Sequence, residues 1–173
     1  MQIEIVQKWD EKNLGQTVFR LNQGRLCSDF ALKMKSALTD CGMDVALSKR
    51  PENFKIEIDF PLIPDRKIVS GGVVLVKKEP MHPLGKVIAS EMTKWGSQSS
   101  TSYRDVIAKI HPLITCDLRI APFFVDGLDA HVCYARLGSL AARICEALRS
   151  ALSLQYRPQI AQGPARKGKA PPQ

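Results

Sequence analysis

Residues 68–76 read Ile-Val-Ser-Gly-Gly-Val-Val-Leu-Val, and this segment constrains the fold more than any other stretch of the chain. Its β-branched apolar residues stand on both sides of a glycine pair. A strand that carries apolar side chains in both directions is covered on both faces. We therefore predict a central strand of a small sheet. Gly71 and Gly72 inside it predict a bulge or a close approach of another backbone.

The segment Phe54-Lys-Ile-Glu-Ile-Asp-Phe60 alternates strictly between apolar and charged residues. This alternation places the apolar side chains on one face of a strand and the charges on the other. Pro61 and Pro64 end the strand, because proline cannot donate to a ladder. We predict that residues 54–60 and 68–76 are antiparallel neighbours, linked through an exposed connection at residues 65–67.

Apolar residues at three- and four-residue spacing predict helices at 27–40, 83–95 and 130–152. The last of these is the longest. Ser102 and Asp105 are typical of a capping box, which predicts a further short helix that ends at Pro112. Residues 114–120 alternate in polarity and predict a half-exposed strand.

These elements predict an α+β or mixed α/β fold: a two-layer sandwich with a mostly antiparallel sheet of about five strands, three to four helices and a long C-terminal helix. We expect residues 1–156 to form a single globular domain. Residues 157–173 are mostly Pro, Gly, Ala, Gln and Lys and predict a disordered basic tail. This tail contributes +4 of the chain's formal net charge of +8.

The excess of basic residues favours a polyanionic partner, which can be nucleic acid, an acidic membrane surface or an acidic protein. Basic side chains flank the predicted hairpin, and others lie in the tail. The candidate nucleic-acid-binding residues are Lys49, Arg50, Lys55, Arg66, Lys67, Lys77, Lys78, Arg166, Lys167 and Lys169. A protein assembly is the other partner that we consider, with the helix at 130–152 as a possible contact for a partner helix.

Two enzymatic alternatives rest on particular residues. Glu57 and Asp59 share a strand face, and with Lys67 they resemble the acidic and basic groups of a magnesium-dependent nuclease. Cys27 lies near a predicted helix start, where the helix dipole can lower the pKa of a thiol and activate it. Neither pattern forms a complete motif.

The sequence predicts no metal site and no cofactor. The three histidines, His82, His111 and His131, lack the i, i+4 spacing of a helical metal pair. The five cysteines are scattered without a Cys-x-x-Cys pair, which favours buried free thiols in a reducing cytoplasm. No run of eighteen apolar residues and no secretion signal stand out, so we expect a cytoplasmic protein without a membrane span.

No motif in the chain forces a chemistry. The sequence therefore favours a non-enzymatic binding or assembly protein, a subunit of a larger complex that contacts nucleic acid through the basic hairpin and the tail. The alternative is a small enzyme, either nuclease-like through Glu57, Asp59 and Lys67 or thiol-dependent through Cys27.

Overall fold

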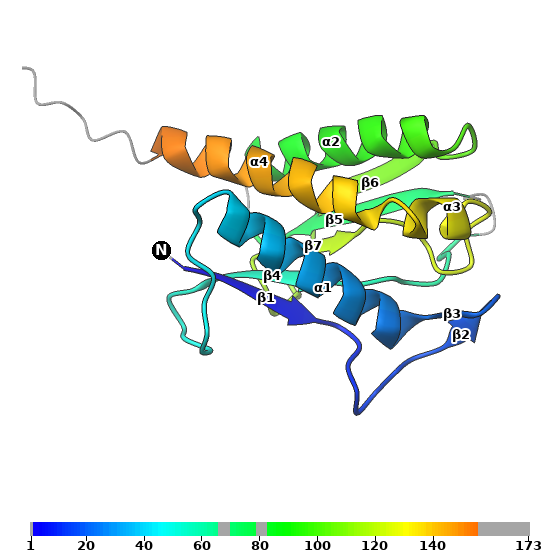
Figure 1. The fold of residues 1–173 in the computed structure, drawn as a ribbon, viewed down its shortest axis with the longest axis horizontal. Coiled ribbons are helices and arrows are strands. Elements are labelled where there is room, and N and C mark those ends of the chain that lie inside the picture. The colour runs from blue at the N-terminus through cyan, green and yellow to red at the C-terminus, as the bar shows by residue number, and fades with distance from the viewer. Residues whose placement is uncertain (1, 66–69, 79–82, 156–173) are drawn as a thin grey trace, which may run out of the picture.

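A computed structural model describes residues 2–65, 70–78 and 83–155 of the chain (Figure 1). The strands are β1 (Ile3–Gln7), β2 (Thr17–Val18), β3 (Leu21–Asn22), β4 (Phe54–Ile58), β5 (Gly71–Val76), β6 (Asp105–Ile110) and β7 (Leu118–Ala121). The helices are α1 (Gln23–Asp40), α2 (Pro83–Ser99), α3 (Ala130–Tyr134) and α4 (Leu137–Gln155). β2 and β3 form a separate small hairpin.

The main sheet has five strands in the order β1-β4-β7-β5-β6. All neighbouring strands are parallel except β5 and β7. The predicted mixed α/β class, the five strands and the long C-terminal helix are confirmed, but the mostly antiparallel sheet is wrong. The predicted hairpin is also wrong, because β7 lies between β4 and β5. The central strand is accordingly β7 and not the segment at residues 68–76.

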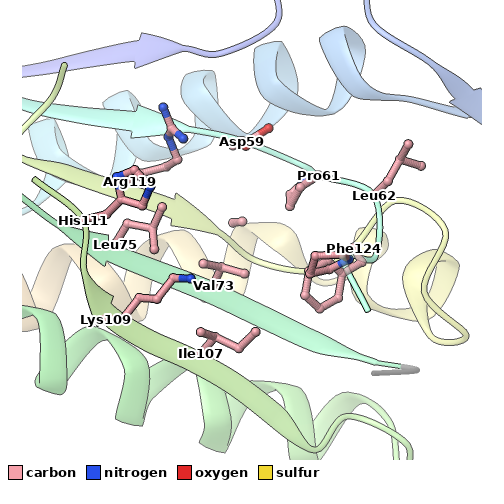
Figure 2. Close-up of a pocket in the computed structure, with 12 residues that line it drawn as sticks. Asp59, Pro61, Leu62, Val73, Leu75, Ile107, Lys109, His111, Arg119 and Phe124 are labelled. Carbon is pink, nitrogen blue, oxygen red and sulfur yellow. The ribbon is translucent and has the colours of Figure 1, made fainter. Parts of the chain in front are cut away.

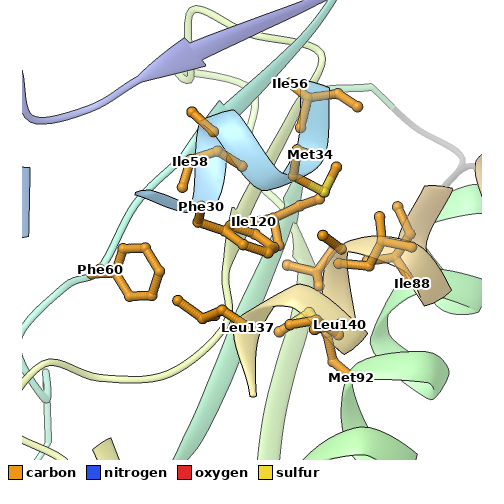
Figure 3. Packing of buried hydrophobic residues seen from close by; sticks show 14 of the residues in the cluster. Phe30, Met34, Ile56, Ile58, Phe60, Ile88, Met92, Ile120, Leu137 and Leu140 are labelled. Atoms are coloured by element: carbon orange, nitrogen blue, oxygen red, sulfur yellow. The ribbon is translucent and has the colours of Figure 1, made fainter. Parts of the chain in front are cut away.

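The three long helices lie on one face of this sheet, with α4 in contact with both α1 and α2 (Figure 1). Alternate strand residues face them and form the main core, among them Ile56 and Ile58 of β4 and Ile120 of β7. Phe30 of α1 and Leu140 of α4 meet these residues from the helix layer (Figure 3). The apolar stripe that we considered for a partner helix is thus covered by the chain's own helices.

Gly72 of β5 confirms the close approach expected from the glycine pair. A Cβ atom at this position would lie 2.7 Å from the carbonyl oxygen of Ala121 and 2.6 Å from Met92 Cε. A side chain here would therefore force β5 away from both β7 and α2. The glycine allows the apolar segment to pack between its neighbours in the sheet and a helix.

The largest local error concerns residues 102–112, where the predicted helix is in fact the edge strand β6. The capping-box pattern misled the prediction, since an isolated capping box says little about the residues that follow it. The other helix boundaries differ less. α1 starts at Gln23, because the Asn22 side chain accepts a hydrogen bond from the Arg25 N–H and caps it. The helix predicted at 130–152 divides into α3 and α4.

Several predictions concern residues outside the described part of the chain. These are the basic tail at 157–173, with Arg166, Lys167 and Lys169, and the connection that contains Arg66 and Lys67. The single-domain prediction for residues 1–156 remains a prediction. Within the described residues, no helix combines the length and the apolar character that a membrane crossing requires.

Candidate functional site

A pocket of about 260 Å³ lies on the sheet face opposite the three long helices (Figure 2). Val73 and Leu75 of β5 and Ile107 of β6 form its apolar floor. The strand period of two explains this arrangement, because residues 73, 75 and 107 point away from the helix layer while their neighbours point toward it. An apolar pocket with a few converging polar groups is the usual form of a small-molecule site.

Charged and polar side chains surround this floor. Lys109 belongs to β6, His111 follows it, and Arg119 comes from β7. The buried Nδ1 atom of His111 has no hydrogen-bond partner among the residues that the structure describes. Asp59 lies at the end of β4 and supplies the acidic group of the pocket (Figure 2). Three segments, the ends of β4 and β6 and the strand β7, thus bring both signs of charge to one cavity.

Glu57 and Arg119 form an ion pair across the neighbouring strands β4 and β7. Their side chains are only 12% and 18% exposed, respectively. Glu57 and Asp59 share the strand face that the alternation predicted. This charged face is not open to solvent, because both acids are buried. Because both partners are buried, this ion pair holds the Arg119 guanidinium group at the wall of the pocket.

Asp59 has the environment of a perturbed carboxyl group. It is 8% exposed, and one of its oxygens accepts a hydrogen bond of 3.1 Å from the Trp9 indole N–H. Burial raises the pKa of Asp59, while Arg119 and the Trp9 hydrogen bond act in the opposite direction. Perturbed carboxyl groups in a cavity are candidates for acid–base chemistry.

We expect Asp59→Asn to increase the free energy of unfolding at pH 7, because asparagine retains an acceptor for Trp9 and removes a desolvated charge. The folded-state pKa of Asp59 lies above its unfolded-state value, so the wild type loses stability as the pH rises through the folded pKa. The gain in the variant should therefore diminish below the unfolded pKa. Urea titrations at pH 7 and near pH 3 measure the difference, and an equal or larger gain at the acidic pH would contradict the assignment.

Cys27 does not fit the thiol-dependent alternative. Its side chain is fully buried in α1, and Sγ lies 3.4 Å from the Ile58 carbonyl oxygen, to which it donates. Burial raises the pKa of this thiol to about 12, opposite to the shift that activation requires. Cys116, Cys133 and Cys145 are also buried free thiols, as the sequence predicts, and Cys41 is partly exposed.

The nuclease-like alternative finds only partial support. Glu57 and Asp59 lie side by side on β4, but Lys67 lies outside the described residues. Across the part of the chain that the structure describes, no three His, Cys, Asp or Glu side chains converge to hold a metal ion. The described residues therefore do not provide the three protein ligands of a catalytic zinc site.

The basic residues proposed for nucleic acid do not flank a hairpin. Lys55 and Lys77 nevertheless lie at the same end of the sheet, because the Asp117 backbone bonds to both, at 3.0 and 3.2 Å. Lys49 and Arg50 are exposed in the loop before β4, and Lys78 is exposed after β5. Their role in binding stays a prediction.

Comparison with known proteins supplies the class of fold. No protein-family model and no curated protein matches the sequence. Among solved structures, the putative N-acetylmuramoyl-L-alanine amidase from Neisseria meningitidis has a TM-score of 0.68 at 13% identity and covers 87% of this chain and 95% of its own. The CwlD amidase from Clostridioides difficile, solved with the GerS lipoprotein, has a TM-score of 0.67 at 13% identity, with coverages of 89% and 100%. An N-acetylmuramoyl-L-alanine amidase of Nostoc punctiforme has a TM-score of 0.62 at 11% identity, with coverages of 89% and 96%.

The chain thus has an amidase-like fold over nearly its whole length. This finding corrects the prediction of a non-enzymatic binding or assembly subunit, because the fold is shared with several amidases. It favours the enzyme alternative over that main prediction. The expectation that the chain is not an enzyme is corrected on the same ground.

Sequence reasoning identified Asp59 but missed its neighbours in the pocket. Lys109 and His111 were assigned to a helix, and Arg119 was assigned to the polar side of a half-exposed strand. The alternation at residues 114–120 could have indicated that Arg119 lies on the same sheet face as the acids of β4. A basic residue in a strand can pair with the acids of β4 if the two strands are neighbours.

Proposed function

We propose that this chain is an amide hydrolase whose substrate binds in the pocket on the helix-free sheet face, with Asp59 as the acid–base residue. The observation that carries the proposal is the buried Asp59 carboxyl group with its raised pKa, placed at the end of a parallel strand in an amidase-like fold.

The raised pKa of Asp59 makes its carboxylate a stronger base than a solvated aspartate. In the proposed reaction, Asp59 accepts a proton from a water molecule as the water oxygen bonds to the amide carbonyl carbon. The same proton then passes to the amide nitrogen, and the C–N bond breaks. The products are a carboxylic acid and an amine, and Asp59 returns to its starting state.

The pocket suits an amide substrate that carries negative charge. The Lys109 ammonium group lines the cavity and can attract a substrate carboxylate or the developing negative charge on the carbonyl oxygen. The apolar floor of Val73, Leu75 and Ile107 excludes water from one side. The related structures are named for the amide between N-acetylmuramoyl and L-alanine, and we propose the same class of cell-wall amide here.

Incubation of the purified full chain with isolated peptidoglycan tests this proposal. We expect new primary amino groups to appear with time, because each hydrolysed amide releases one amine. Labelling with an amine-reactive fluorophore measures them. The matched control is Asp40→Asn, which changes an exposed aspartate at the end of α1 and should leave the rate unchanged. No amine release by a folded wild-type protein would contradict the proposal.

A further inference from the structure

The edge strand β6 has one row of backbone groups that no other strand of the described sheet pairs with. β6 pairs with β5 in parallel, and the His111 N–H donates to the Val76 carbonyl oxygen. This register directs the backbone groups of the odd-numbered residues of β6 toward β5. The N–H and C=O groups of Val106, Ala108 and Ile110 therefore point away from the sheet.

These six groups make no hydrogen bond within the described part of the chain. The opposite edge of the sheet, at β1, is better covered. There both backbone groups of Ile3 are hydrogen-bonded. Its N–H donates to the Asp44 carbonyl oxygen at 2.9 Å, and its carbonyl oxygen accepts from the Ala46 N–H at 2.8 Å. Only Ile5 and Gln7 of β1 remain open. β6 is thus the longer unpaired edge, and such an edge readily pairs with another strand.

We propose that β6 pairs with β6 of a second copy of this chain, in an antiparallel, two-fold symmetric arrangement centred on Ala108. In this register Ala108 exchanges two hydrogen bonds with its symmetry mate. Val106 of each copy exchanges two more with Ile110 of the other. The twelve open groups of the two copies then form six hydrogen bonds, and none of them is left over.

The side chains of β6 are compatible with this register. Ala108 is exposed and small, so nothing at the symmetry axis blocks the approach of the two backbones. The pairing is centred on Ala108, so the residue after it in one copy faces the residue before it in the other. On the pocket face, Lys109 of one copy therefore lies opposite Ile107 of the other. Two lysines are therefore never directly opposite, which is the arrangement that would repel.

The pairing also joins the two pockets. Ile107 and Lys109 line the pocket of their own copy and would stand beside those of the second copy. The two five-stranded sheets become one continuous sheet. This inference does not depend on the proposed hydrolysis, since it rests on the backbone of β6 alone.

Ala108→Pro tests the inference without breaking the sheet within one copy. Proline removes the N–H at residue 108, and this N–H faces away from β5, so no internal hydrogen bond is lost. The matched control is Gln7→Pro, which removes an outward-facing N–H from the other edge. In sedimentation velocity we expect the wild type and Gln7→Pro to be dimers and Ala108→Pro to be a monomer. A monomeric wild type, or an Ala108→Pro variant that is still dimeric, would overturn the inference.

A crosslinking experiment remains informative if the proline variant does not fold. Antiparallel residues that exchange hydrogen bonds have Cα atoms about 5.5 Å apart, which lies within the range of a disulfide. In a Cys41→Ser background, Ala108→Cys should therefore form an intermolecular disulfide on oxidation. Gln7→Cys in the same background should not. Equal crosslinking of the two variants, or crosslinking of Gln7→Cys alone, would contradict the pairing at β6.

Discussion

Asp59→Asn is expected to lower the rate of amide hydrolysis by about 100- to 10,000-fold, the usual contribution of a positioned acid–base group. Asparagine cannot accept a proton from water at neutral pH, so the first step of the proposed reaction loses its base. The fold should be unaffected, because an asparagine oxygen can still accept the 3.1 Å hydrogen bond from Trp9. Initial rates of amine release, compared at equal protein concentration, measure the effect.

Asp59→Asn is expected to raise the stability of the fold and to lower the rate of hydrolysis. These opposite directions make the test specific for a catalytic role. The variant should unfold at a higher urea concentration at pH 7 while it loses activity, since the desolvated carboxylate costs stability and supplies the chemistry. A variant that is destabilised and inactive would indicate only a structural role for Asp59. A variant with wild-type activity would remove Asp59 from the reaction.

Gly96→Ala is expected to destabilise the fold by about 1–3 kcal/mol or more, as overpacking of a closed core does. A Cβ atom at Gly96 of α2 would overlap the ring of Tyr103. The ring has no room to move. It is 3% exposed, packs edge-on against Trp95 with centroids 5.9 Å apart, and its hydroxyl donates to the Pro122 carbonyl oxygen at 2.8 Å. Urea titration measures the change in the free energy of unfolding.

Gly138→Ala is the matched control for this substitution. Gly138 also lies in a helix, α4, but its nearest neighbour for an added Cβ is Lys33 Cε at 4.0 Å. Gly138 lies in the first turn of α4, and an added Cβ meets no close neighbour there, so this variant should be about as stable as the wild type. Equal effects of the two substitutions would show that the contact between α2 and Tyr103 is not close.

The elements that sequence reasoning located best are those with a strong period. α1, α2, α4 and β4 have apolar stripes that face the core, and the stripe alone determines which face packs against the main core. The pairing of the strands could not be read in this way. β4 and β5 are near in sequence, yet β7 lies between them, because parallel strands need long crossover connections that carry no local signal.

The pocket could not be predicted from the sequence for the same reason. Asp59 was singled out from the alternation of one strand, but a cavity depends on side chains from four segments and on their relative register. Lys109 could not be placed there while β6 was treated as a helix. The burial of Asp59, and hence its raised pKa, is a consequence of tertiary packing that no pattern within residues 54–60 contains.

The identity of the bond that is cleaved tests the central claim most directly. Mass spectrometry of isolated peptidoglycan after incubation with the wild-type chain would determine it. We predict intact glycan strands that have lost their peptides, together with peptides that begin with a free L-alanine amine, because the proposed reaction breaks only the amide between the two. Muropeptides of unchanged mass, or cleavage only at glycosidic bonds or within the peptide, would contradict the proposed function.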